Sequence, residues 1–306
     1  MLLAQLSLNA LILGAAYALV AIGFVLILNA TGAVNFAQGD LVMVGGFCGV
    51  GLAGYLPVSG LVLLPLVAVI MGLLGMAIAL CAYFPLSRRP PEAMLISTIA
   101  VGIILQNGAN LLFGPDAKAT PALLGNGDWR VGGLVLSQQG MAVLLVAILL
   151  VGSLQLVFSK TQLGRRLRAT AQDRDVASAL GIPVNTMIAA TFGVGIALSG
   201  IAGLLLTHTF FVTPTDGGNY MLKAYIAVVL GGWGSLPGAV AGALLIAFFE
   251  VIFPSLPVVA PFLANVPGAS EMFTQTASTI VFDCLVLVVL LFRPQGLFGE
   301  AMQVRP

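Results

Sequence analysis

The chain has 306 residues, of which 59% are hydrophobic and only 8% are charged, and its formal net charge at pH 7 is +1. Soluble domains carry about 25% charged residues, so this composition excludes an ordinary soluble protein and indicates an all-α polytopic membrane protein. The near-neutral charge also excludes the basic surface that a nucleic-acid-binding protein presents.

A membrane-spanning helix needs about 20 largely apolar residues, and eight stretches of the chain meet or approach that length. In chain order they are residues 6–28, 40–56, 61–84, 94–113, 141–158, 187–207, 239–253 and 276–292. A ninth apolar stretch, residues 222–230, is too short to span a membrane unaided. We therefore expect a single transmembrane domain over residues 1–306, with about eight to nine transmembrane helices.

Two of the loops between these stretches are basic. Loop 85–93 carries Arg88 and Arg89, and loop 159–185 carries five of the twelve Lys and Arg residues of the chain. Because cytoplasmic loops carry an excess of Lys and Arg, we expect both loops in the cytoplasm and the N-terminus outside.

Loop 159–185 is also the one long polar segment between the apolar stretches. Residues 166–180 are rich in alanine and other good helix formers, and Gly181 followed by Pro183 is typical of a helix end. The sequence therefore predicts a short cytoplasmic helix over residues 166–180. The alternative is a solvated loop whose charges only fix the orientation of the chain.

The apolar pattern is interrupted in two places, by NFAQGD at residues 35–40 and by GGWGSLPG at residues 231–238. Broken helices in corresponding parts of two halves are typical of a transport pathway. We compare residues 17–46 with residues 192–234 and predict a weak internal repeat. The candidate residues of a substrate path are Asn35, Gln38, Asp40, Gly231, Gly232, Gly234 and Ser235. The alternative is that both breaks are surface loops.

Residues suited to enzymatic chemistry are scarce. His208 is the only histidine, the three cysteines lack the spacing of metal ligands, and the chain has no phosphate-binding G-x-x-x-x-G-K-[ST] motif. We predict no catalytic residue, no metal ion and no cofactor. A membrane-embedded enzyme would need a clustered acid–base or metal constellation.

Four ionisable residues lie within or at the edges of apolar stretches, where charge is costly and often functional. They are Asp40, Lys223, Glu250 and Asp283. No two acidic residues share one span with helical spacing, so each is interpreted first as an interfacial or helix-terminal group.

Six motifs resemble those of one family of membrane proteins. In order they are YALVAIG at 17–23, VNFAQGD at 34–40, LGR at 163–165, RATAQD at 168–173, ASALGI at 177–182 and VLGGWGSLPG at 229–238. The chain resembles the permeases of branched-chain amino acid ABC transporters, and more narrowly the high-affinity permease that pairs with a second, homologous permease. The resemblance extends from about residue 8 to residue 296.

The resemblance implies an importer subunit in the inner membrane that works by alternating access. The implied partners are ATP-binding subunits that hydrolyse the ATP, a second permease, a periplasmic or extracellular substrate-binding protein and the lipid bilayer, with no nucleic acid. Loop 159–185 would carry a coupling helix that docks on the ATPase. The residues implied in this coupling are Gly164, Arg165, Arg168, Ala171, Asp173, Ala177 and Gly181.

The sequence departs from the family pattern at two positions. Gln38 stands where relatives commonly have histidine, and Trp233 stands in a glycine-rich turn where smaller residues are usual. Transport of urea or short amides by a member of the same family, and a stand-alone secondary carrier or channel, are the alternative functions.

Overall fold

The computed structural model describes residues 1–56, 58–87, 89–125, 127–131, 133–264, 272–293 and 295–298. The long helices are α1 (Leu2–Thr31), α2 (Gln38–Tyr55), α3 (Gly60–Ile78), α4 (Pro91–Phe113), α5 (Gln138–Lys160), α8 (Val184–Phe210), α9 (Gly217–Gly231), α10 (Leu236–Ile252) and α14 (Gln275–Phe292). The shorter helices are α6 (Gln162–Gln172), α7 (Arg174–Ala179), α11 (Leu256–Val259) and α12 (Pro261–Ala264). Single π and 3-10 turns, Ala79–Tyr83 and Phe84–Leu86, extend α3, and the 3-10 turn Phe253–Ser255 extends α10. Strands β1 (Asp128–Val131) and β2 (Leu134–Ser137) form an antiparallel hairpin in which Asp128 pairs with Ser137.

The prediction of an all-α polytopic membrane protein is confirmed. In the described part of the chain, seven helical segments are long and apolar enough to cross a membrane: Leu2–Thr31, Gly60–Leu86, Glu92–Phe113, Gln138–Lys160, Val184–Phe210, Leu236–Val259 and Gln275–Phe292. The predicted span 40–56 is a helix too, α2, but its polar first turn leaves it short of a full span. The stretch 222–230, expected to be too short to span a membrane, lies in α9, which has 15 residues.

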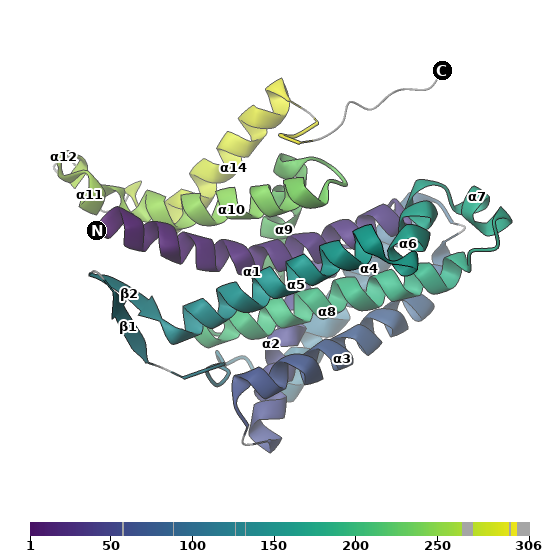
Figure 1. Ribbon diagram of the computed structural model, residues 1–306, viewed down its shortest axis with the longest axis horizontal. Helices are drawn as coiled ribbons and strands as arrows, with labels where there is room; N and C mark the ends of the chain where they lie inside the picture. Colours follow the sequence, from purple (N-terminus) through teal and green to yellow (C-terminus); the bar gives the residue numbers. More distant parts are fainter. Residues whose placement is uncertain are drawn as a thin grey trace.

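Helices α1 and α8 form the centre of the bundle and run in opposite directions (Figure 1). Both are hydrophobic on all sides, as expected of helices that other helices surround. They cross where Gly23 meets Gly195, and a Cβ added to either glycine would lie within 3 Å of the carbonyl oxygen of the other. The crossing therefore depends on glycine at both positions.

The internal repeat is an inverted one. Helix α10 packs along α1, and α3 packs along α8 in the same manner. Helices α2 and α9 both begin inside the bundle after a break, and their first turns meet where Gly39 contacts the backbone of Gly217. The half that begins with α1 is thus matched by an antiparallel half that begins with α8.

The second break of this repeat differs from the predicted one. It is the segment 211–216 between α8 and α9 that corresponds to residues 32–37 between α1 and α2. Residues 231–238 instead comprise the end of α9, the turn 232–235 and the start of α10. The two named breaks do not correspond, because the turn after α9 contains more glycine than the segment before it. The compared ranges 17–46 and 192–234 do correspond, since they contain α1 with the start of α2 and α8 with α9.

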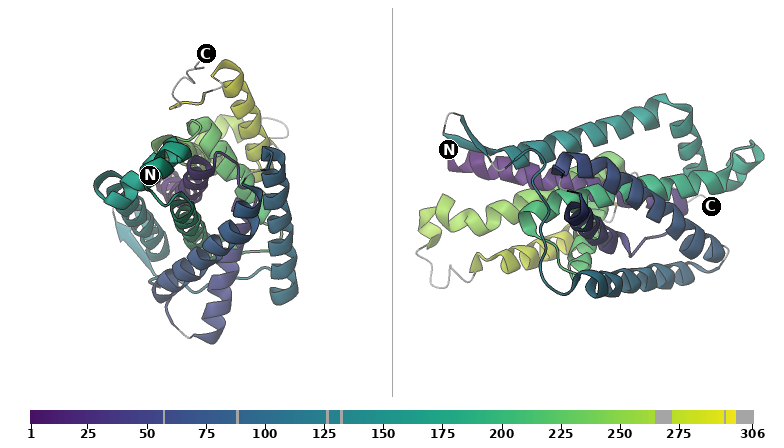
Figure 2. Two further views of the ribbon diagram at one scale, coloured as in Figure 1. Left: turned by 90° about the vertical axis from the view of Figure 1, so that its right-hand side faces the viewer. Right: turned by 90° about the horizontal axis from the view of Figure 1, so that it is seen from below.

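The two ends of the bundle are formed by different parts of the chain (Figure 2). The N-terminus and the hairpin lie together at one end, where the side chain of Gln5 forms two hydrogen bonds with the backbone of Val135. Helices α6 and α7 and the turn between α3 and α4 lie at the opposite end. The two loops predicted to share the cytoplasmic side therefore share one end of the molecule.

Candidate coupling surface and candidate substrate path

The polar loop at the α7 end contains two helices where the sequence predicted one over residues 166–180. Helix α6 ends at Gln172, and Asp173 takes an extended backbone conformation with φ −156° and ψ 113°. Its Oδ1 accepts hydrogen bonds from the N–H groups of Asp175 and Val176, at 2.9 and 3.0 Å. These two N–H groups bond the side chain of Asp173 in place of the carbonyl groups of α6. Asp173 therefore acts as an N-cap, and a new helix starts at residue 174.

The end of α7 agrees with the prediction. Gly181 has a φ of 78°, a left-handed conformation that suits glycine. The N–H of Ile182 donates to the carbonyl of Ala177, and the N–H of Gly181 donates to that of Ser178.

Arg174 ties α7 to the centre of the bundle. Its guanidinium donates a hydrogen bond of 2.9 Å to the carbonyl oxygen of Ala30, in the last turn of α1. A cation at the carbonyl end of a helix is favourable because the helix dipole is negative there. This hydrogen bond joins α7 to the C-terminal end of α1.

The seven coupling candidates divide into two groups. Five are on the outside: Arg165, Arg168, Ala171, Asp173 and Gly181. Gly164 and Ala177 are buried inside the chain. A Cβ at position 164 would collide with the backbone at the end of α5, so the small size of Gly164 serves the packing of α6 and not an external contact.

Sequence reasoning missed two apolar residues on this surface. Val176 and Leu180 are 55% and 74% exposed, although both are large and hydrophobic. They are four residues apart, Val176 in α7 and Leu180 at its C-cap, so they lie on the same side of this segment. An apolar pair at i and i+4 inside a basic polar segment was the signal that could have identified them.

The first break forms a chain of hydrogen bonds that ends at the middle of α8. The Nε2 of Gln38 donates to the hydroxyl of Ser199 at 2.5 Å, and the Nδ2 of Asn35 donates to the Oε1 of Gln38 at 3.2 Å. Gln38 is completely buried. The chain of hydrogen bonds from Asn35 through Gln38 to Ser199 gives the buried amide of Gln38 its partners, which is what a polar interruption inside a membrane requires.

Asp40 lies where α2 and α9 meet. Its Oδ1 accepts a hydrogen bond of 2.8 Å from Gln106 of α4, and its side chain lies against Gly217 at the start of α9. The carboxylate is thus at the N-terminal ends of two helices, where the backbone dipoles favour negative charge.

The four residues of the second candidate break lie at another level of the bundle. Asn29 donates a hydrogen bond of 2.9 Å to the carbonyl of Gly234, whereas the amide of Gln38 lies beside Gly23. Six residues of α1 separate these two contacts, or about 9 Å along a helix. The structure therefore does not bring Asn35, Gln38 and Asp40 together with the turn 231–235.

Local packing explains the composition of that turn. Gly231 and Gly238 are in backbone contact, Gly232 and Gly234 have φ values of 116° and 82°, and Ser235 caps α10 by accepting from the N–H of Gly238. The exposed Trp233 packs edge to face on Tyr225, with ring centroids 6.2 Å apart.

A charged cluster that joins α1, α9, α10 and α14 was not predicted. Lys223 forms an ion pair with Glu250, with Nζ to Oε1 at 2.7 Å, and donates to the hydroxyl of Tyr17 at 2.6 Å. Gln275 donates to the same carboxylate at 2.9 Å. The sequence interpretation treated Lys223 and Glu250 as separate interfacial groups, because a separation of 27 positions gave no sign that they pair.

Comparison with known proteins identifies the family. A family model described as "Branched-chain amino acid transport system / permease component" matches residues 6–292. This chain belongs to that family.

Several relatives in the permease family align over nearly the whole chain. The high-affinity branched-chain amino acid transport system permease protein BraD of Pseudomonas aeruginosa is 34% identical over 305 residues, which cover 95% of this chain and 94% of BraD. The corresponding permease LivH of Escherichia coli is 32% identical, with the same coverage of both chains. A probable branched-chain amino acid transport permease of Methanocaldococcus jannaschii, LivM, is 23% identical and covers 82% of this chain and 72% of its own. A solved structure titled "PsaBC from Streptococcus pneumoniae in complex with Fab" covers 94% of this chain and 91% of its own, but its TM-score of 0.49 and 18% identity are too low to inform the fold.

Proposed function

We propose that this chain is the membrane-spanning permease subunit of an ABC importer of the inner membrane, which moves branched-chain or other small aliphatic amino acids into the cytoplasm. A partner ATPase hydrolyses the ATP, and a second, homologous permease completes the passage. The observation that carries the proposal is the membership of residues 6–292 in a family of such permeases. The relatives of this chain include both a LivH and a LivM protein, and this supports the paired arrangement.

The docking site for the ATPase is loop 159–185. The exposed apolar pair Val176 and Leu180 fills a groove on the partner, and the exposed Arg165, Arg168 and Asp173 form polar contacts around it. A fully desolvated apolar anchor with a polar rim is the usual composition of a strong interface. The hydrogen bond from Arg174 to α1 passes movement of the ATPase to the centre of the bundle.

The substrate path runs beside the meeting point of α2 and α9, where Asn35, Gln38 and Asp40 lie. Helices that begin inside a membrane point free backbone N–H groups and a positive dipole end into the bundle. Two such helix ends meet here. Alternating access opens this point first to one side and then to the other, and the turn containing Gly231, Gly232, Gly234 and Ser235 borders the path at its cytoplasmic end.

Two measurements on the purified protein test the proposed function. The tagged chain is isolated in mild detergent and its bound subunits are identified by mass spectrometry, and the isolated complex is then tested for ATP-dependent uptake of leucine into proteoliposomes. We expect an ATP-binding subunit, a second polytopic permease and ATP-dependent uptake. A chain that purifies alone and transports leucine or urea without ATP would refute the proposal in favour of a carrier.

A matched pair of variants tests the docking surface. Leu180→Asp places a charge in the apolar anchor, so we expect the ATPase to be lost from the purified complex while the second permease stays. Leu124→Asp makes the same change at another exposed leucine, in the loop before the hairpin, and should leave the complex intact. Equal retention of the ATPase by both variants would contradict a docking role for α7.

A further inference from the structure

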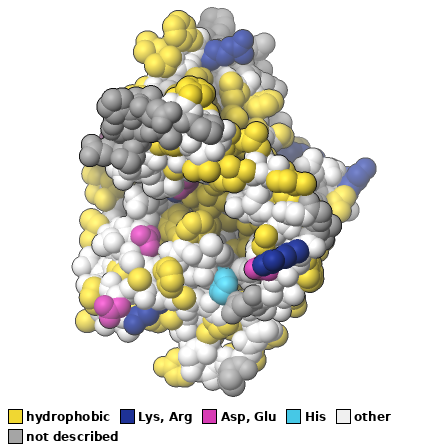
Figure 3. All heavy atoms as spheres, turned by 90° about the vertical axis from the view of Figure 1, so that its left-hand side faces the viewer, with side chains coloured by type: hydrophobic (Ala, Val, Ile, Leu, Met, Phe, Trp, Pro, Cys, Tyr) yellow, Lys and Arg dark blue, Asp and Glu magenta, His cyan; other side chains and the backbone are white. Residues whose placement is uncertain are grey.

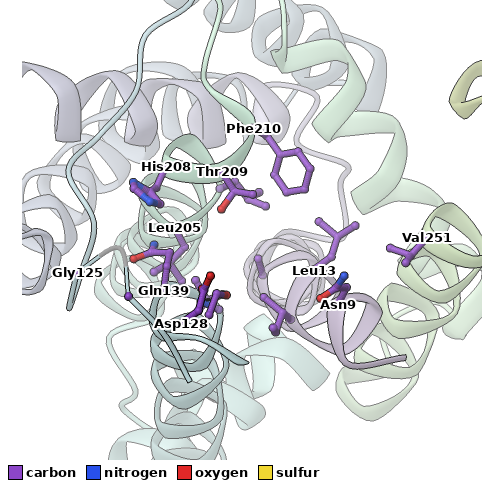
Figure 4. Close-up of a pocket in the computed structure, with 17 residues that line it drawn as sticks. Asn9, Leu13, Gly125, Asp128, Gln139, Leu205, His208, Thr209, Phe210 and Val251 are labelled. Carbon is purple, nitrogen blue, oxygen red and sulfur yellow. Dashed lines mark hydrogen bonds between the residues drawn. The ribbon is translucent and has the colours of Figure 1, made fainter. Parts of the chain in front are cut away.

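Polar side chains at the hairpin end of the bundle lie where a membrane protein meets water. Figure 3 shows this end, with a few charged side chains among hydrophobic ones. A cavity of about 560 Å³ lies here, and Figure 4 shows Asn9, Asp128 and His208 among the residues that line it. The ends of a membrane-spanning bundle reach the polar headgroups and the water beyond them, so these side chains need no partner protein. A polar group at the middle of a span has no such access.

Asp283 is a polar group of this second kind. It lies at the middle of α14, about 12 Å from either end of the helix. Its side chain is half-buried, and it takes part in no ion pair or hydrogen bond among the described residues. It lines a pocket with Lys223 and Thr279 whose volume of about 30 Å³ is too small for an amino acid, and the ammonium group of Lys223 is bound to Glu250. Because a carboxylate at this depth is costly unless it is paired, Asp283 calls for a donor that the described residues do not supply.

Other exposed polar side chains of the spans are satisfied by their own helix. The amide of Asn107 in α4 donates to the carbonyl of Ile103 at 2.8 Å, and the hydroxyl of Ser153 in α5 donates to that of Leu150 at 2.9 Å. An ionised carboxylate has no hydrogen to donate, so the carbonyl groups of α14 cannot satisfy Asp283. The donor for Asp283 must come from another helix.

Polar and apolar side chains alternate on the surface around Asp283. Thr279 is one turn before Asp283 on α14, and Asn219 is one turn before Lys223 on α9, so each pair lies on one side of its helix. Lys223, Thr279 and Asp283 line the same pocket, which places these two sides next to each other. Leu222 is 57% exposed beside them. We call this surface, formed by Asn219, Leu222, Lys223, Thr279 and Asp283, the α9–α14 face.

The inverted repeat leaves a position open beside this face. In the first half, α4 covers the start of α2, where the hydroxyl of Thr98 accepts a hydrogen bond of 3.2 Å from the N–H of Phe36. No described helix does the same for α9, whose first turn has no side-chain cap and exposes Gly218 and Asn219. Figure 1 shows α14 at the edge of the bundle, away from α1. Unpaired backbone inside a membrane is tolerated only against protein or in a water-filled cavity, so further protein belongs beside the start of α9.

We propose that the α9–α14 face is the contact surface for the second permease, and that a donor side chain on a spanning helix of that permease binds the carboxylate of Asp283. The inference rests on the proposed function, which supplies the second permease as the occupant. It deepens that function, because it states which helices of this chain meet the partner. Lipid chains offer no donor to Asp283, whereas a polar side chain among apolar ones is a usual contact between helices in membranes.

The first test is photocross-linking in the complex of this chain with the ATPase and the second permease. The photoreactive residue p-benzoylphenylalanine replaces Leu222 of α9, Leu287 of α14 or, as a control, Leu149 of α5, which are 57%, 64% and 62% exposed. Helix α5 lies on the opposite side of the bundle from α14 in the right-hand view of Figure 2. We expect Leu222 and Leu287 to give cross-links to the second permease and Leu149 to give cross-links to lipid. Cross-links from Leu222 and Leu287 to lipid alone, or to a second copy of this chain, would overturn the inference.

The second test removes the carboxylate. Asp283→Leu should lower the recovery of the second permease with the tagged chain by about five- to ten-fold, since the loss of one polar contact between membrane helices is of this order. The ATPase should remain bound, because it docks at α7. Asp283→Asn keeps an acceptor oxygen and should lower the recovery by only about two-fold. Gln155→Leu, which changes an exposed polar residue of α5, should leave the recovery unchanged.

The outcomes separate this inference from the proposed function. A wild-type complex that lacks a second permease would refute the proposed function. A wild-type complex that contains it, and in which Asp283→Leu recovers as much of it as Gln155→Leu does, would overturn the inference alone. If Asp283→Leu loses the ATPase as well, the variant is misfolded, and the cross-links from Leu222 and Leu287 in an otherwise unchanged chain decide.

Discussion

The ion pair between Lys223 of α9 and Glu250 of α10 makes a quantitative prediction about the stability of the bundle. The two charged groups are 2.7 Å apart, and their side chains are only 25% and 17% exposed. At an effective dielectric constant of about 20, two charges at this separation attract each other by about 6 kcal/mol. Taking both charges out of water costs several kcal/mol per ion, so the net contribution of the pair is small.

Removing one partner has a much larger effect than removing both. Lys223→Met leaves the Glu250 carboxylate without its cation, and Glu250→Gln leaves the ammonium group without its anion. A fully buried orphan charge costs about 3–5 kcal/mol. The partial exposure of both side chains reduces this to about 2 kcal/mol for each single variant. The double variant leaves no orphan charge and should lose only about 1 kcal/mol, which gives a coupling energy of about 3 kcal/mol.

Thermal unfolding in detergent measures these differences. At about 2 °C per kcal/mol for a chain of this size, each single variant should melt about 4 °C lower than wild type and the double variant about 2 °C lower. Lys160→Met, at the exposed end of α5, removes a lysine that takes part in no ion pair among the described residues and should melt like wild type. The reasoning is refuted if the double variant loses as much as the two single variants together.

Three further predictions concern glycine packing, the first break and the coupling segment. Gly203→Ala places a Cβ against the backbone of α2 and should lower the free energy of unfolding by about 3 kcal/mol. Gly108→Ala adds a Cβ that has no neighbour within 4 Å, and should raise the free energy of unfolding by up to about 1 kcal/mol. The melting temperatures of the two variants and of the wild type measure both effects. Gln38→Leu leaves the buried hydroxyl of Ser199 without its amide donor and should cost about 1–3 kcal/mol in thermal unfolding, and a Ser199→Ala change in the same chain should recover part of that loss. Asp173→Ala removes the cap of α7, worth about 1 kcal/mol, so hydrogen exchange at the first amides of α7 should become about five-fold faster, and unchanged exchange would show that the cap does not hold the helix.

The sequence predicted correctly those features that depend on interactions between residues close together in the chain. Long apolar stretches predicted every one of the long helices, because a helix in a membrane must satisfy its backbone hydrogen bonds within itself. Gly181 marked the end of α7 through its own left-handed conformation. The motifs in residues 17–238 indicated the family, and the match over residues 6–292 confirms it.

Two predictions made from local patterns were wrong. The helix predicted over residues 166–180 is broken because the side chain of Asp173 caps α7 in preference to continuing α6. The pairing of breaks was wrong because glycine content identifies a close backbone contact, as between Gly231 and Gly238, but not the depth at which it lies.

The sequence by itself determined the class of the protein, its long helices, its basic end and its family, since each of these follows from composition and short-range pattern. Only the tertiary structure decided that Gln38 bonds Ser199, that Lys223 pairs with Glu250, and that Arg174 bonds the carbonyl of Ala30. Helices that are hydrophobic on all sides carry no periodic signal of which face meets which neighbour. The contacts that position the polar groups were therefore set by close glycine crossings between distant segments, which no local pattern encodes.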